Sequence, residues 1–562
     1  MQRALTQRRG VRIRVSTLAL FTGCLWLGPL AGANAGEASS SAAIRIPITE
    51  VDTVPATQTF GQSFTIHSLA LQAKPAAALP ADSATRHNLA LPDRTLSFTA
   101  KAGAVVFEDQ QGAPVAEIGY FAYLLDGAEP RKRPITFAIN GGPGAASAWL
   151  HIGALGPWRL PITPEAAHPT AANGLVPNAE TWLDFTDLVF IDPVGTGYGR
   201  LHQKAAEAIL DLSKDGKVEL PKKLRKDRIT QDAKTLREKF WSVQGDTSSI
   251  VVFIKRWLEA NGRLDSPKVF LGESYGGFRA PRIAQSLQST PDFALRGVIL
   301  VSPALSAMGT DFPGLASVLT RVSQFPSLAA AIADGKAPVS PQQLAAFERE
   351  AGGDYLADLL AGPRDKAAIE RLAARVSATT GLDVDTVRHL GPRSAPQVFL
   401  AAIDRKSGLT HSNYDATAKR YAAYDGPTLI DAGEDLGGLS AQLGRAIADL
   451  GKQQLAWKPE REYHVRGPGA SWAWAGQESV SALRSALVRD PAFRVLVAHG
   501  YADLVTPYFR TKLTLEQMPT IGADNRVRLE VYGGGHMFYS RDQSRVQFRR
   551  DAVQFFEAIS RR

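Results

Sequence analysis

The strongest sequence constraint on the fold of this chain is a five-residue turn between a strand and a helix. Gly272-Glu273-Ser274-Tyr275-Gly276 follows the apolar run Lys268–Leu271 and precedes a helical segment that begins near Phe278. Small glycines on both sides of Ser274 allow a sharp turn that holds the serine hydroxyl group above the end of a sheet. A serine in a glycine-rich turn is the ordinary interpretation of such a pattern, but the flanking strand and helix favour a nucleophile.

Further short apolar runs predict the rest of the sheet. They alternate with helical segments such as 250–260, and this order is typical of βαβ units. We therefore expect an α/β-hydrolase fold, with a mainly parallel central sheet flanked by helices and a helical lid insertion. The predicted strands are 135–139, 188–191, 268–271, 298–301, 494–498 and 527–532, preceded by a hairpin within 105–123.

The chain divides into five predicted parts. Strands stop after the first core region and return only near residue 494, and the Ala-rich helical pattern between them predicts the lid. The parts are a signal peptide at 1–35, an extended N-terminal arm at 36–95, the first part of the core at 96–305, the lid at 306–490 and the second part of the core at 491–562.

The N-terminus has the three regions of a secretory signal. Arginines at Arg8 to Arg14 precede an apolar stretch, Val15 to Leu30, which is too short for a comfortable membrane span. Ala33-Asn34-Ala35 predicts cleavage before Gly36, although a retained anchor and a twin-arginine signal are alternatives. We expect a periplasmic or secreted protein with no stable membrane insertion once the signal is removed.

Charge and cysteine content narrow the function classes. The formal net charge is +9, and five of the arginines lie before residue 36, so the remaining chain gives no indication of nucleic-acid binding. Cys24 is the only cysteine and lies in the predicted signal. The mature chain therefore has no disulfide, thiol nucleophile or thiolate metal site, and no motif indicates a cofactor. Nothing in the sequence indicates the oligomeric state.

Two strand ends supply partners for the serine. A serine hydroxyl group needs a base, and the base needs a carboxylate to orient it. Asp503 follows the predicted strand 494–498, and His536 follows 527–532. The order serine, acid, histidine is the one that the α/β-hydrolase fold uses. A turn-forming aspartate and a structural histidine are the ordinary alternatives, and His499 is a competing base.

An early glycine loop completes the predicted site. The oxyanion of an acyl-transfer reaction needs two N–H donors. Tyr275, directly after the serine, supplies one in this fold. The loop Asn140-Gly141-Gly142-Pro143-Gly144 follows a strand, and we expect Gly142 to supply the other. A simple turn is the alternative, and the absence of a following Gly-Lys-Ser/Thr disfavours a phosphate-binding loop.

Taken together, these motifs resemble those of the serine carboxypeptidases, peptidase family S10. By that resemblance Asn140, Gly141 and Glu273 bind the C-terminal carboxylate of a peptide or protein, and Met537 lines the pocket of the leaving residue. The resemblance covers about residue 135 to the C-terminus. It rests on Asn140–Gly144, Leu155-Gly156-Pro157, Asp192–Tyr198, Gly272–Gly277, Asp503 and Gly535-His536-Met537.

Two positions depart from the pattern. Family members often carry a Glu before Leu-Gly-Pro that pairs with the Glu beside the nucleophile, but here that position is Ala154. Ala145 stands where a cysteine is common. A carboxylate can hydrogen-bond another carboxylate only if one of them is protonated, so Glu273 should have a raised pKa and peptide binding should be favoured at acidic pH.

Other functions stay open at this stage. The same triad serves esterases and acyltransferases. Proline-directed aminopeptidases have a similar glycine loop but usually a His where Asn140 stands, and a non-catalytic binding protein would not need the triad. Trp472-Ala473-Trp474 predicts either a substrate wall or, more simply, buried packing of the lid.

Overall fold

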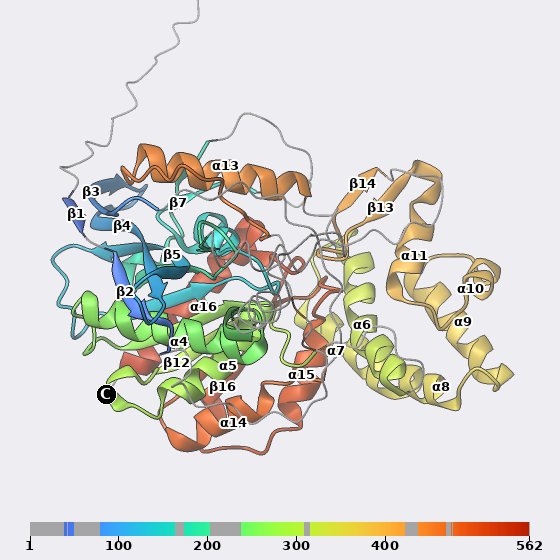
Figure 1. Ribbon diagram of the computed structural model, residues 1–562. Coiled ribbons are helices and arrows are strands. Elements are labelled where there is room, and N and C mark those ends of the chain that lie inside the picture. The colour runs from blue at the N-terminus through green and yellow to red at the C-terminus, as the bar shows by residue number, and fades with distance from the viewer. Residues whose placement is uncertain are drawn as a thin grey trace, which may run out of the picture. The chain divides into compact units, whose positions relative to one another are not determined.

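A twelve-stranded sheet forms the centre of the described chain (Figure 1). The computed structural model describes residues 39–41, 43–49, 79–162, 174–202, 236, 238–307, 315–421, 437–467, 472, 474 and 476–560. The expected signal at 1–35 lies outside these ranges.

One half of the sheet is parallel. β9 (Asp187–Asp192), β6 (Ile135–Ile139), β11 (Lys268–Glu273), β12 (Gly297–Val301), β15 (Arg494–Gly500) and β16 (Val527–Tyr532) are successive parallel neighbours. All six strands were predicted, and their carboxyl ends meet at one edge. This is the arrangement in which open α/β sheets place their sites.

The other half is antiparallel and reaches further towards the N-terminus than expected. β5 (Pro114–Leu125) pairs with β9 and with β4 (Thr95–Glu108), and β4 pairs in turn with β3 (Asp82–Ala90). The short strands β1 (Ser39–Ser41), β2 (Ile44–Pro47) and β10 (Arg200–Leu201) extend this half. The extended arm expected at 36–95 is therefore wrong for 82–90, which is a full strand of the sheet.

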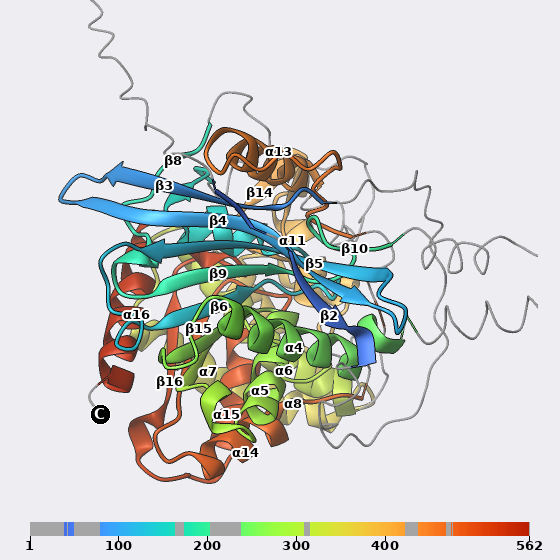
Figure 2. The same cartoon turned by 60° about the vertical axis from the view of Figure 1, so that its left-hand side comes forward.

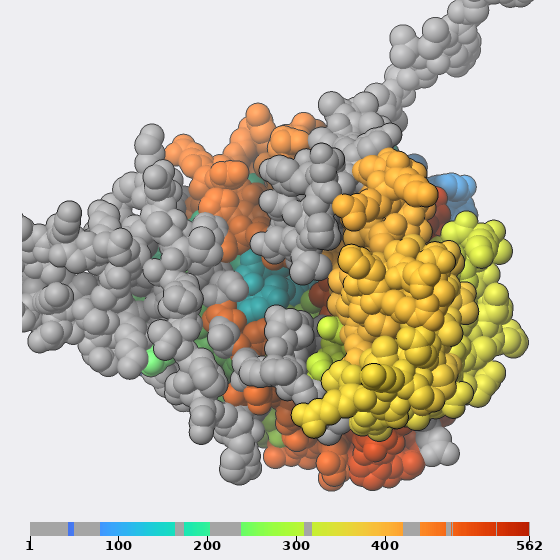
Figure 3. All heavy atoms as spheres, turned by 90° about the vertical axis from the view of Figure 1, so that its right-hand side faces the viewer, coloured from blue at the N-terminus to red at the C-terminus, as the bar shows by residue number. Residues whose placement is uncertain are grey.

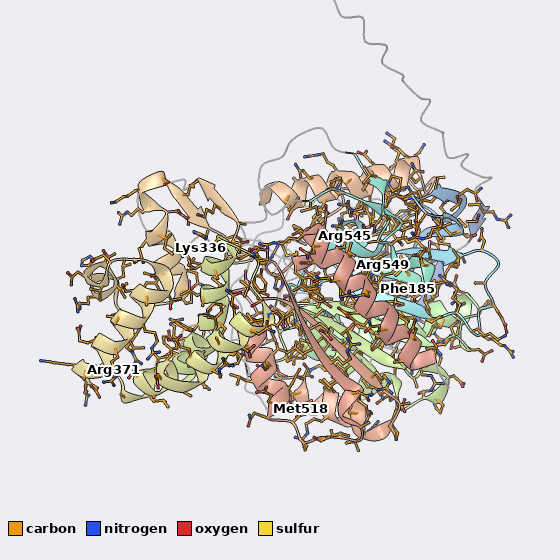
Figure 4. All side chains as sticks on the ribbon, turned by 180° about the vertical axis from the view of Figure 1, so that it is seen from behind. Phe185, Lys336, Arg371, Met518, Arg545 and Arg549 are labelled. Carbon is orange, nitrogen blue, oxygen red and sulfur yellow. The ribbon has the colours of Figure 1, made fainter. Side chains whose placement is uncertain are left out.

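Helices cover both faces of the sheet. α4 (Val243–Ala260), α5 (Tyr275–Leu287) and α14 (Val480–Arg489) bury apolar residues in one core cluster, and Figure 2 shows α4 and α5 in front of the strands. α13 (Gly437–Gln453) and α16 (Asp542–Ser560) contribute to the second cluster. On α16, Arg549 lies 5.6 Å from the ring centre of Phe185 (Figure 4). These layers confirm the α/β-hydrolase fold.

A group of helices with its own core follows β12. We define the lid as residues 315–421. It comprises α6 (Leu315–Asp334), α7 (Pro341–Glu350), α8 (Leu356–Ala361), α9 (Lys366–Thr380), α10 (Val384–Leu390), α11 (Pro396–Ile403) and the hairpin β13 (Leu409–His411) and β14 (Lys419–Tyr421), seen face-on in Figure 3. Its apolar cluster continues into Tyr501, Leu504 and α15 (Tyr508–Glu516) of the hydrolase core.

The second half of the insertion expected at 306–490 packs differently. α13 and α14 pack on the sheet rather than in the lid cluster. Trp457 and Tyr463 between them are also buried in the second sheet cluster. The helices that share a separate core therefore end before residue 422.

Candidate active site

Ser274 occupies a strained turn between β11 and α5. Its φ of 58° and ψ of −119° lie in a region that side chains rarely adopt. The two flanking glycines are required by space, because a Cβ atom on Gly272 would lie 2.0 Å from the carbonyl oxygen of Gly276. Ser274 is half-buried, whereas its neighbours Glu273 and Tyr275 are buried. The turn thus leaves the serine side chain partly exposed, although the side chains on either side of it are buried.

Asp503 and His536 form a buried pair. Oδ2 of Asp503 lies 2.7 Å from Nδ1 of His536, and both side chains are at most 3% exposed. The backbone N–H groups of Val505 and Thr506 donate to Oδ1 of Asp503 at 2.8 and 2.9 Å. A carboxylate held in this way fixes the orientation of the imidazole and leaves Nε2 as the ring nitrogen able to act on a substrate.

The loops that carry the three residues are joined through Ser302. The Ser302 hydroxyl group donates to the carbonyl oxygen of His536 at 2.8 Å. On the other side, the N–H group of Ser274 donates to the carbonyl of Val301 at 2.9 Å. No hydrogen bond joins Ser274 to His536 among the residues that the structure describes. Catalytic hydrogen bonds are often long in the absence of substrate.

His499, the competing base, has a different environment. Its Nε2 lies 3.0 Å from the hydroxyl group of Thr511. Complete burial lowers the pKa of His499 to about 3. Asp503 forms its hydrogen bond with His536 instead, so the geometry favours His536 as the base.

The glycine loop after β6 lies against the turn that carries Ser274. A Cβ atom on Gly141 would lie 2.6 Å from the backbone nitrogen of Tyr275. Gly142 has a φ of 107°, where only glycine is free of strain. Tyr275 is the first residue of α5, so its N–H group has no partner within the helix. The predicted oxyanion residues Gly142 and Tyr275 therefore lie on adjoining segments.

Glu273 lies in a buried polar cluster with Asn140 and Tyr539. The hydroxyl group of Tyr539 donates to Oε2 of Glu273 at 2.7 Å. Asn140 acts to lower the pKa values of both groups, and its own Oδ1 accepts the N–H group of Leu150 at 3.1 Å. The structure thus brings together Asn140 and Glu273, which the sequence paired, and adds a tyrosine.

Burial and nearby charges shift the pKa values of these groups in opposite directions. Burial raises the pKa of Glu273 to about 7, although the charge of His536 and the hydrogen bonds of Tyr539 and Asn140 oppose this. Burial would lower the pKa of His536, but the Asp503 carboxylate outweighs it and the pKa is raised. Burial would raise the pKa of Asp503, but His536 outweighs it and the pKa is lowered.

The lid contacts the loop that carries His536 directly. The carbonyl oxygen of Tyr414 accepts the N–H group of His536 at 2.5 Å. The two rings stand edge to face with centres 5.4 Å apart. A Cβ atom on Gly535 would lie 2.0 Å from the Tyr414 carbonyl oxygen, which explains the glycine before His536.

The other residues singled out in the sequence are Met537, Trp472 and Trp474. Met537 is half-buried beside the second core cluster. Trp472 is 6% exposed, and its indole N–H group donates to the hydroxyl group of Tyr275 at 3.3 Å. Trp474 packs edge to face on Tyr275, with ring centres 5.0 Å apart. These aromatic rings support the segment that carries Tyr275, one of the predicted oxyanion residues.

The described ranges contain neither a cluster of metal-ligating side chains nor a membrane-spanning helix. No group of three or more His, Cys, Asp or Glu residues within them could hold a metal ion. No helix within them has the length and apolar character needed to cross a bilayer.

Comparison with known proteins gives a family match for part of the chain. The sequence profile described as serine carboxypeptidase matches residues 92–311, which include the glycine loop and Ser274. This part of the chain is therefore similar to the serine carboxypeptidase family. The matched region ends before Asp503 and His536, so the second half of the site rests on the geometry above.

Among similar proteins, serine carboxypeptidase-like 44 of Arabidopsis thaliana is 26% identical over 209 residues, 35% of this chain and 34% of that protein. Serine carboxypeptidase-like 42 of the same plant is 26% identical over 223 residues, 38% and 37% of the two chains. The pheromone-processing carboxypeptidase of Podospora anserina is 25% identical over 158 residues, 28% and 20%. The match thus spans at most about a third of these relatives.

Solved structures of other hydrolases are also similar, though distantly. Proline iminopeptidase of Mycobacterium smegmatis is 14% identical, with 84% of this chain and 98% of that chain covered and a TM-score of 0.30. A lipase in its open form is 14% identical, with 82% and 100% covered and a TM-score of 0.32.

Sequence reasoning missed three contacts of the candidate site. They are the hydroxyl groups of Thr506 and Tyr539 and the carbonyl group of Tyr414. Thr506 and Tyr539 each lie three residues after a predicted triad member, and proximity was the only signal available. Tyr414 lies in the lid, whose sequence carried no motif.

Proposed function

We propose that this chain is an exported serine carboxypeptidase that hydrolyses the C-terminal peptide bond of peptides or proteins. The observation that carries the proposal is the pair Asp503–His536, with 2.7 Å between Oδ2 and Nδ1, on loops tied to the strained turn of Ser274. Similarity to the serine carboxypeptidase family makes this chemistry the expected one for such a site.

In the first half of the reaction, Ser274 Oγ attacks the carbonyl carbon of the scissile bond. Nε2 of His536 takes the hydroxyl proton, and the carboxylate of Asp503 stabilises the resulting imidazolium. The N–H groups of Gly142 and Tyr275 receive the oxyanion. His536 then donates its proton to the leaving amine, which leaves an ester on Ser274.

In the second half, water attacks this ester. His536 accepts a proton from the water and returns it to Ser274 Oγ, which releases the shortened peptide. The same groups act in both halves, so no cofactor enters the proposed cycle. Oxyanion donors contribute a factor of about 10²–10³ each in related serine enzymes.

Recognition of a free C-terminus is assigned to the cluster of Asn140 and Glu273, with the backbone of Gly141. Glu273 is 3% exposed, and its pKa of about 7 keeps it protonated in mildly acidic solution. A protonated carboxyl group donates a hydrogen bond to the peptide carboxylate, whereas an ionised one repels it. Peptide hydrolysis should therefore be favoured at acidic pH. Met537 follows the catalytic histidine, as expected for a residue beside the leaving-residue pocket.

A panel of N-blocked peptides with free and amidated C-termini tests the proposal. We expect cleavage of the free acids, a large loss on amidation and no cleavage by Ser274→Ala. Equal cleavage of both forms, or activity only on simple esters, would assign the triad to an esterase or acyltransferase. Unchanged rates in Ser274→Ala would reject Ser274 as the nucleophile.

Export is proposed from residues 1–35 alone. The mature protein should begin at Gly36, and N-terminal sequencing of protein recovered from the periplasm or medium checks this. Retention of Val15 to Leu30 in a membrane fraction would identify an anchor instead.

A further inference from the structure

Tyr539 is the one buried side chain in the carboxylate cluster that the proposed reaction does not use. It is 1% exposed, and its hydroxyl group lies 2.7 Å from Oε2 of Glu273. Its ring packs beside Gly153, where Cε2 would lie 3.4 Å from an added Cβ atom. Gly153 precedes Ala154, so Tyr539 occupies the region next to the position that lacks an acidic partner for Glu273.

The hydrogen bonds of this cluster have a fixed direction. The N–H group of Leu150 donates to Oδ1 of Asn140 at 3.1 Å, so the amide NH₂ group of Asn140 faces the opposite way. This NH₂ group is the only donor on that side chain. The O–H group of Tyr539 donates to Oε2 of Glu273, because an ionised carboxylate oxygen can only accept.

A donor aimed at Oε2 decides where the proton of the neutral acid lies. The carbonyl oxygen of a neutral carboxylic acid is a stronger acceptor than its hydroxyl oxygen, so a donor on Oε2 favours the form with the proton on Oε1. The other titratable groups near Glu273 are His536 and Asp503, which act on it through their charges rather than as its hydrogen-bond partners. Tyr539 thus makes the two carboxyl oxygens of Glu273 different, because its O–H group donates to only one of them.

We propose that Tyr539 is a positioning residue of the carboxylate-binding site, which holds Oε2 of Glu273 as an acceptor so that Oε1 donates to the C-terminal carboxylate of a peptide substrate. A phenol here takes the place of a second carboxyl group. The inference rests on the proposed carboxypeptidase function and assigns the substrate class as peptides with a free α-carboxylate.

The test compares two substrates with the same acyl part, an N-blocked peptide with a free C-terminus and an N-blocked amino-acid ester. In Tyr539→Phe, KM for the peptide should rise about threefold to tenfold at mildly acidic pH, because one hydrogen bond that orients the acid is lost. The ester does not use the carboxylate site, so its kcat and KM should stay near the wild-type values.

The pH dependence of peptide KM gives a second readout, because the direction of its shift can be predicted. The Tyr539 bond favours the ionised form of Glu273, so Tyr539→Phe should move the rise of peptide KM to higher pH, by roughly half to one unit. Replacing Tyr539 with 2,3-difluorotyrosine keeps the ring and strengthens the donor, so it should move the rise to lower pH. If the phenylalanine variant does not fold, the inference can still be tested with this second replacement.

Tyr120→Phe is the matched control. Tyr120 is also a buried tyrosine, and it donates to Oδ2 of Asp82 at 2.8 Å in the antiparallel half of the sheet. Its removal should leave KM for both substrates and the pH profile unchanged. Equal losses for peptide and ester in Tyr539→Phe, or an unmoved pH profile, would overturn the inference. Absence of peptide release by the wild type would instead reject the proposed function itself.

Discussion

The hydroxyl group of Thr506 lies 3.0 Å from Nδ1 of His536, on the same side as the Asp503 carboxylate. It also donates to Oδ2 of Asp503 at 2.7 Å and lies 2.9 Å from the carbonyl oxygen of Ser302. One side chain therefore contacts the base, the acid and the segment that follows β12.

Thr506→Val tests this relationship. Valine keeps the shape but removes the hydroxyl group, and a hydrogen bond to an ionised group contributes about 1.5–3 kcal/mol. We expect kcat/KM to fall roughly tenfold to a hundredfold with the fold intact. Thr506→Ser should restore much of the activity.

Thr511→Val is the control for this substitution. Thr511 is a buried threonine 3.0 Å from the ring of His499, which the reaction does not use. Its kcat/KM should match the wild type. If both valine variants lost activity equally, Thr506 would have no special role.

Peptide and ester hydrolysis should depend differently on pH. Burial raises the pKa of Glu273 to about 7, and in the proposed function this group binds a peptide carboxylate only while protonated. KM for free-acid peptides should therefore rise as the pH passes about 7. Ester hydrolysis needs only neutral His536 and should continue to increase, because Asp503 raises the pKa of His536 above 6.5. Steady-state kinetics across pH 4–9 measures both.

Glu273→Gln removes the titrating group. Glutamine remains neutral, so the rise of peptide KM near neutral pH should disappear while the ester profile is retained. A rise that persists in this variant would locate the responsible group elsewhere.

Gly141→Ala should disable the oxyanion site. The new methyl group would lie 2.6 Å from the Tyr275 nitrogen, so the loop or the donor has to move. Losing one oxyanion donor costs a factor of about 10²–10³ in kcat. Gly352→Ala is the matched control, because nothing lies within 4 Å of its Cβ position. Wild-type kcat in Gly141→Ala would exclude this loop from the reaction.

Arg541 should contribute to stability at the junction of lid and core. Its guanidinium group lies 3.0 Å from Asp334 and 3.7 Å from Asp415, both partly buried carboxylates. Arg541→Met leaves both acids without this cation, and we expect the free energy of unfolding to fall by about 1–3 kcal/mol. Denaturant unfolding measures it.

Arg388→Met provides the comparison on an exposed surface. Arg388 pairs with Glu370 at 2.7 Å, and its side chain is 43% exposed. Surface pairs contribute about 0–1 kcal/mol, so the loss should be small. Equal losses in the two variants would contradict the role given to Arg541.

The parallel strands were predictable because their residues are apolar without interruption. All five residues of Ile135–Ile139 are buried, as are those of Gly297–Val301. The motifs that follow these strands meet at one edge, so the positions of Ser274, Asp503 and His536 could be anticipated from strand order. Buried strands of this kind give the clearest signal in a sequence.

β3 was missed because polar residues occupy its buried positions. Asp82 is buried and accepts the hydroxyl group of Tyr120, and His87 is buried 2.8 Å from Thr85. These polar groups interrupt the apolar alternation that predicts a strand. Tyr539 and Thr506 were missed for another reason, because a single contact depends on side-chain directions set by separate elements.

The bond between the Tyr414 carbonyl group and the His536 N–H group has a mechanical consequence. Displacing the segment that carries Tyr414 would remove a backbone hydrogen bond from His536. Removing residues 315–421 should therefore loosen the imidazole as well as delete the lid helices.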